Sequence, residues 1–82
     1  MTLERIYAVE YGYGLYDSNE SANITKIIFK TLEVSEKYAE IFKRSKEYQE
    51  IRAEYDFSYI ALMEYTIGLP DTGICIKMVD EK

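Results

Sequence analysis

The chain has 82 residues, a formal net charge of -5 at pH 7 and a hydrophobic fraction of 48%. This length allows one domain, residues 1–82, and the hydrophobic fraction excludes global disorder. With no histidine and a single cysteine, the chain cannot form a Ser-His-Asp triad, a Cys-His pair, an internal disulfide or the usual Cys/His zinc site.

The excess of acids also disfavours direct nucleic-acid binding, because phosphate recognition needs clustered cations. The apolar stretches are too short to cross a bilayer, and the first residues lack the basic start and long apolar run of a signal peptide. A lone cysteine fits a reducing compartment. We therefore expect no membrane contact and a cytoplasmic location.

The first predicted elements are two strands joined by a long loop. Residues 3–11 alternate with the two-residue period of a strand, which Gly12 and Gly14 are expected to end. Residues 13–23 are polar and rich in turn-forming side chains, and residues 24–30 are apolar again. We expect a hairpin around this loop.

One long helix is predicted next, with Thr31 as its N-cap and Tyr55 near its end. The residues expected to be buried share one stripe: Val34, Tyr38, Ile41, Phe42, Ser45 and Tyr48. Arg52 interrupts that stripe, so the helix either outruns the core or breaks near Ser45 and restarts. We favour one helix with a frayed or kinked last third.

The last third of the chain is predicted to be β again. Residues 57–66 alternate with two largely apolar faces, which is typical of a central strand. A tight turn at 69–73, a final strand at 74–79 and a solvated tail at 80–82 follow, with Cys75 as a buried structural thiol. The order β-β-α-β-β predicts an α+β domain, in which one long helix packs on one face of a mainly antiparallel sheet.

Five glutamates share one side of the predicted helix: Glu36, Glu40, Glu47, Glu50 and Glu54. At about 100° per residue they fall within roughly 80°, and they would span about 27 Å. Nothing desolvates them to raise a pKa, so we expect no enzymatic activity and no catalytic residue. Residues 17–28 fail the calcium-loop pattern at Ala22 and Ile28, and Gly12 and Gly14 alone make no nucleotide motif, so we expect no metal and no cofactor. Such a row could occupy a basic groove made for nucleic acid, although any amphipathic helix also needs a charged outer face.

Tyrosines form the second candidate surface. Tyr13 and Tyr16 lie in the predicted loop, where tyrosine gives rigid contact area at low entropic cost. The alternative is that both side chains pin the loop, while Tyr7 and Tyr11 pack on the sheet. Unpaired sheet edges also favour a homodimer.

Three segments carry a resemblance: residues 6–12 (IYAVEYG), 28–33 (IFKTLE) and 38–40 (YAE). Together they resemble small uncharacterised proteins of bacteriophages and their hosts, which open with a tyrosine- and valine-rich strand and a second strand that ends in a capped helix. The resemblance covers the first half of the chain. It implies a phage or mobile-element origin, hence the host cytoplasm, and transfers no catalytic residue.

Our leading hypothesis is a small acidic, non-catalytic binding protein, a phage-encoded inhibitor of a host enzyme or defence nuclease. Its five helix glutamates would engage a basic groove of a host or phage protein, with Tyr13 and Tyr16 as anchors. One alternative is a small-molecule-binding or sequestering module that uses the tyrosine-rich loop. Another is a structural or accessory subunit that assembles through a sheet edge.

Overall fold

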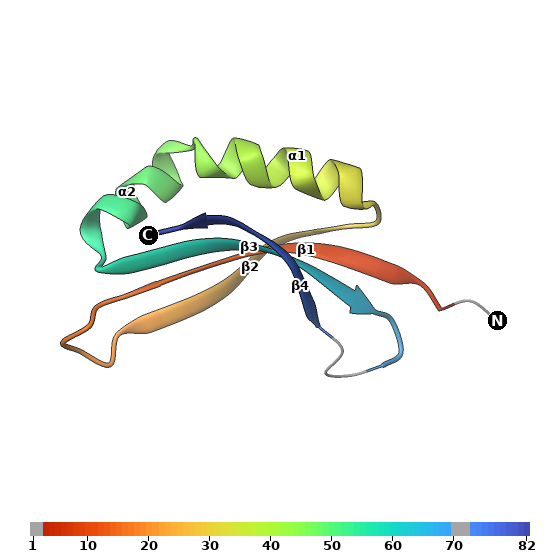
Figure 1. Cartoon of the computed structure of the whole chain (residues 1–82), viewed down its shortest axis with the longest axis horizontal. Coiled ribbons are helices and arrows are strands. Elements are labelled where there is room, and N and C mark those ends of the chain that lie inside the picture. The colour runs from red at the N-terminus through yellow and green to blue at the C-terminus, as the bar shows by residue number, and fades with distance from the viewer. Residues whose placement is uncertain (1–2, 70–72) are drawn as a thin grey trace.

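The computed structural model describes residues 3–69 and 73–82, so most of the predicted turn at 69–73 lies outside the described residues. The elements are β1 (Arg5–Gly14), β2 (Ser21–Phe29), α1 (Leu32–Lys43), α2 (Lys46–Glu54), β3 (Phe57–Thr66) and β4 (Ile74–Glu81). The strands form one antiparallel sheet in the order β2-β1-β3-β4, which confirms the α+β class and the central position of β3. Both helices lie on one side of it (Figure 1). We call that side the helix face and the other the open face.

The predicted long helix is two helices, which is the main correction to the sequence-based fold. Ser45 separates them: its Oγ accepts the Tyr48 N–H at 3.2 Å and donates to the Phe42 carbonyl oxygen at 2.6 Å. The Ser45 backbone is extended (φ -70°, ψ 152°), so the chain changes direction before α2 begins. This change buries Tyr48 completely. The break near Ser45 that the sequence left open is therefore the arrangement observed.

β1 continues through Gly12 and Gly14, where the sequence predicted its end. A Cβ on Gly12 would lie 2.4 Å from the Tyr59 ring, and one on Gly14 would lie 2.4 Å from the Phe57 ring. The two glycines therefore allow rings of β3 to lie close to β1 instead of forming a turn. The predicted hairpin is confirmed, but its loop is shorter, and β2 begins at Ser21.

The predicted solvated tail is part of the fold, because β4 extends to Glu81. Asp80 accepts hydrogen bonds from the Tyr48 hydroxyl at 2.7 Å and from the Arg52 Nε at 3.1 Å. Lys82 donates to the Arg52 carbonyl oxygen at 2.5 Å. Arg52, which interrupted the predicted apolar stripe, thus connects α2 to the C-terminal strand.

The core lies between the helices and the helix face of the sheet. Its buried residues are Val9, Tyr11, Ala39, Phe42, Tyr48, Ile60 and Leu62. α1 approaches the strands through Ser35 and Ala39, two small residues with no exposed surface. This close approach turns neighbouring bulky positions outward, so Val34 (48% exposed) and Ile41 (67% exposed) are not buried as predicted.

Candidate interaction surfaces

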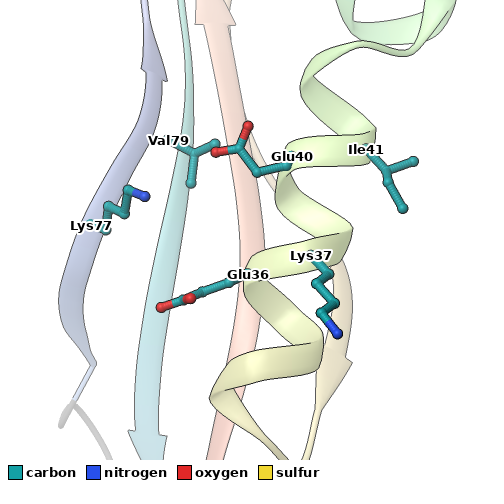
Figure 2. A pocket seen from close by; sticks show the side chains of 6 residues that line it. All are labelled: Glu36, Lys37, Glu40, Ile41, Lys77 and Val79. Carbon is teal, nitrogen blue, oxygen red and sulfur yellow. The ribbon is translucent and has the colours of Figure 1, made fainter.

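The five helix glutamates do not form one continuous row. Figure 2 shows Glu36 and Glu40 directed from α1 toward β4. Glu47, on α2, instead reaches β2 at the opposite edge of the sheet, where its Oε1 lies 3.1 Å from the Lys26 Nζ. Because the chain turns at Ser45, the periodicity that aligned these side chains in a straight helix no longer applies.

Two of the three α2 glutamates are already paired with a lysine. The carboxylate of Glu47 hydrogen-bonds Lys26 and thereby raises the pKa of that ammonium group, and Lys26 also lies 5.4 Å from the centre of the Phe42 ring. Glu50 lies 3.9 Å from the Lys46 Nζ on the same helix. Glu54, near the end of α2, is exposed and has no cation within 4.0 Å among the described residues, but it does not line the groove that Glu36 and Glu40 share. The predicted surface therefore narrows to Glu36 and Glu40.

Glu36 and Glu40 line a groove of about 450 Å³ between α1 and β4 (Figure 2). The other lining residues are Lys37, Ile41, Lys77 and Val79. Val79 packs against the core and supplies an apolar wall, while Lys77 contributes one ammonium group from β4.

The charges of this groove are unevenly paired. Lys37 lies 3.4 Å from Glu33, so it is engaged along the helix. Within residues 3–69 and 73–82, neither Glu36 nor Glu40 has a cation within 4.0 Å. Two free carboxylates beside an apolar wall suit a cationic side chain that carries an aliphatic stem, as lysine and arginine do.

The two candidate tyrosines have different surroundings. Tyr13 is half-buried, with its ring 4.4 Å from that of Tyr55 and 6.3 Å from that of Tyr11. Tyr16 is 74% exposed, and its ring centre lies 5.8 Å from that of Phe57. Its backbone N–H donates to the Asp56 carboxylate at 2.7 Å, which holds the loop in place. Neither tyrosine lines the α1–β4 groove. A ligand site in this loop stays a prediction.

The open face is an exposed surface that the sequence analysis did not predict. Strand register places these residues there: Ser21, Asn23, Thr25 and Ile28 of β2, Ile6, Ala8, Glu10, Gly12 and Gly14 of β1, Phe57, Tyr59, Ala61, Met63 and Tyr65 of β3, and Cys75, Met78 and Glu81 of β4. No helix covers it in the described part of the chain (Figure 1). The available signal is the apolar second face of residues 57–66, which is typical of a central strand and also of a sheet face that is left without a covering helix.

Two aromatic rings of the open face lie flat against the backbone of β1. The Tyr59 ring covers Gly12, and its hydroxyl accepts a hydrogen bond from the Asn23 Nδ2 on β2. Phe57 covers Gly14 in the same way, with Tyr16 beside it. Rings lying over glycine fill space that strand side chains would otherwise occupy, which gives the face low relief.

The open face carries few charges: besides Glu10 it holds the exposed Glu81, which stands opposite Tyr59 at the end of the edge strand β4. The basic residues of the strands, Arg5, Lys26 and Lys77, all belong to the helix face, where they meet acids or line the α1–β4 groove. Glu10 lies on the open face but is only 8% exposed. Its carboxylate accepts the Tyr65 hydroxyl, and this hydrogen bond, with burial, raises the pKa of Tyr65 to about 12.

Cys75 is exposed, which corrects the prediction of a buried thiol. It stands opposite Met63 on the open face, and its Sγ lies 3.9 Å from the Met78 Sδ. The reason is positional: β4 is an edge strand, and the helices cover only the other face of the sheet.

The sheet edges carry features that oppose strand addition. The register of β2 shifts opposite Val9 and Glu10, and Lys26 beside this bulge turns inward to Glu47. The register between β3 and β4 shifts twice. Bulges and inward charges interrupt the regular row of backbone groups that a further strand would need.

Among the residues the structure describes, no group of three or more Cys, Asp or Glu side chains is arranged to hold a metal ion. No helix in the same residues is long and apolar enough to span a membrane. No protein-family model, curated protein or solved structure matches this chain.

Proposed function

We propose that this chain is a small, non-catalytic protein-binding module that holds a basic segment of a protein partner against the β4 side of α1. The observation that carries the proposal is the pairing state of Glu36 and Glu40. Of the five helix glutamates, these two both line a groove and lack a nearby cation in the described residues. Val79 beside them offers apolar contact for the stem of a bound lysine or arginine.

The narrower hypothesis, a phage-encoded inhibitor that mimics nucleic acid, has less support from this geometry. Mimicry of a phosphate row would need the carboxylates in one line, and the break at Ser45 sends Glu47 toward Lys26 instead. The proposal therefore names a protein partner with a basic segment and leaves the phage origin as an expectation of the sequence resemblance.

The test is a pull-down from bacterial lysate that compares charge-matched variants. The groove variant carries Glu36→Lys and Glu40→Lys, and its control carries Glu50→Lys and Glu54→Lys on exposed positions of α2. We expect partners held by the wild type and the control to be lost from the groove variant. Their retention should also weaken as ionic strength rises, because exposed charge pairs are screened.

Two outcomes would contradict this proposal. One is that the groove variant retains every partner that the wild type recovers. The other is that both double variants lose their partners equally, which would indicate a response to net charge rather than to the groove. Circular dichroism of each variant shows whether the fold is kept, so that unfolding is not mistaken for lost binding.

A further inference from the structure

The open face is a largely apolar sheet surface on which nothing else packs in the described residues. An antiparallel sheet that faces water on one side normally carries polar residues there. Here Ile28 is 55% exposed and Met78 is 43% exposed, on either flank of the half-buried Tyr59 and Met63. Exposed apolar surface of this kind marks an interaction site.

We propose that the open face packs against the open face of a second copy of this chain, giving a two-fold dimer with two sheets inside and the helices outside. This inference goes beyond the proposed function, because it uses the opposite side of the sheet from Glu36 and Glu40.

The area of the open face is sufficient for such a dimer. Four strands spaced about 4.8 Å apart and roughly 30 Å long present about 600 Å² per copy. Two copies would bury about 1,200 Å², which reaches the lower limit of standard stable interfaces. Two twisted sheets pack face to face at about 10 Å when their side chains are apolar. Most side chains of this face are apolar, and its polar members Asn23, Thr25 and Glu81 belong to the two edge strands.

The distribution of charge favours a second copy over other partners. Among the described strand residues, no lysine or arginine lies on the open face, so the strands offer no cation there to nucleic acid or to an anionic membrane. Its central acid, Glu10, is already buried and hydrogen-bonded to Tyr65. Two identical copies therefore meet without opposing like charges at the centre of the interface.

The net charge of -5 does not prevent this contact. Face-to-face sheets about 10 Å apart, with a helix layer outside each, keep the acidic helices at least about 20 Å from each other. That separation exceeds the Debye length of about 8 Å at physiological salt, so repulsion between the helix layers is screened.

The surface relief is also compatible with self-packing. Ala8 (1% exposed) and Ala61 (5% exposed) are small side chains at the middle of the face, so this part of the surface projects little. Tyr59 lies across Gly12 beside these alanines instead of standing upright from the sheet. A face of this shape can be covered by an identical one without steric conflict from projecting rings.

The test is sedimentation equilibrium of the full chain over a range of concentrations. We expect a reversible dimer, and we expect Ile28→Asp or Met78→Asp to raise its dissociation constant at least about 100-fold, since each dimer would bury two unpaired carboxylates. The matched controls are Ile41→Asp on α1 and Ile74→Asp on β4, both at exposed apolar positions away from the open face. These should leave the dissociation constant within about threefold.

The native Cys75 supplies a second measurement. Its thiol is exposed in the single chain and lies on the open face, so a dimer should protect it. The rate of reaction with a thiol reagent should fall as protein concentration rises, and in Ile28→Asp it should be at least about tenfold faster than in the wild type at the same high concentration.

A wild-type chain that stays monomeric at all concentrations would overturn the proposal. So would a dimer that Ile28→Asp and Met78→Asp leave intact, or one that Ile41→Asp or Ile74→Asp dissociates instead. The Glu36→Lys, Glu40→Lys variant should remain dimeric, so failure of the dimer and failure of the groove proposal are distinguishable.

Discussion

Both faces of the sheet are largely apolar, but they differ in what covers them. On the helix face, Ile60 and Leu62 are fully buried beneath the helices, and the Tyr48 hydroxyl bonds Asp80 and Ser58 under the same layer. On the open face, rings of β3 lie over glycines of β1, and no helix within residues 3–69 and 73–82 adds a second layer. An apolar strand face thus indicates that something packs on it, but not whether the partner belongs to the same chain.

The largest expected difference between the two faces is in the free energy of unfolding lost when a side chain is truncated. Leu62→Ala, on the helix face, should lower the free energy of unfolding by about 2–5 kcal/mol, because it leaves a cavity in a fully buried site. Met78→Ala, on the open face, should cost less than about 1 kcal/mol in dilute protein. Urea denaturation at low and high protein concentration checks both values.

The dependence of these two stability losses on protein concentration gives a second test of the same comparison. The cost of Met78→Ala should grow as the wild type dimerises, whereas the cost of Leu62→Ala should not depend on dimerisation in this way. Equal costs for the two substitutions in dilute protein would mean that the faces are not energetically distinct.

An alkaline titration compares a hydroxyl on each face. Burial foremost, with the hydrogen bond to Asp80, raises the pKa of Tyr48 to about 12, and the hydrogen bond to Glu10 foremost raises that of Tyr65 to about 12. Both groups are neutral in the folded state at pH values where an unfolded tyrosine, with a pKa near 10, is already ionised. Their stabilisation is therefore complete below about pH 10 and is lost as the pH rises toward 12.

For Tyr48 this loss should amount to about 1–3 kcal/mol. Tyr48→Phe and Tyr65→Phe should each flatten the fall of the unfolding free energy between pH 10 and 12, as measured by urea denaturation at fixed pH values. Slopes identical to that of the wild type would show that these hydroxyls ionise as they do in the unfolded chain.

The smallest effect concerns the rings of the open face. Gly12→Ala should destabilise the protein by about 1 kcal/mol, because the new methyl group would displace the Tyr59 ring, while the lower entropy of the unfolded alanine chain offsets part of that cost. A double-mutant cycle with Tyr59→Ala tests the cause. In the Tyr59→Ala background, Gly12→Ala should become neutral or stabilising, and an unchanged cost there would assign the effect to the backbone of β1.

Much of the fold was predictable because its signals are local. Thr31 caps α1 as predicted, with its Oγ accepting the Val34 N–H at 3.4 Å. β3 covers residues 57–66, as the alternation of the sequence indicated, and the first two strands form the predicted hairpin. Each of these features depends on side chains only a few residues apart, so a single sequence contains the information.

The candidate sites were less predictable because they depend on long-range contacts. Glu47 pairs with Lys26, 21 residues away, and no helical projection contains that partner. Gly12 looked like the end of a strand because the Tyr59 ring that lies over it comes from β3. Cys75 looked buried because its strand is apolar, whereas the order of strands places it at an edge.

The sequence by itself determined the α+β class, the antiparallel pattern, the N-cap of the first helix and the absence of histidine chemistry. Only the tertiary structure decided where the helix breaks, which glutamates remain unpaired and which apolar face stays uncovered. The physical reason is that Ser45 is compatible with a helix interior as well as with a cap. The break was selected because it buries Tyr48 between α2 and the sheet, within reach of Ser58 and Asp80, and those partners come together only when the chain has folded.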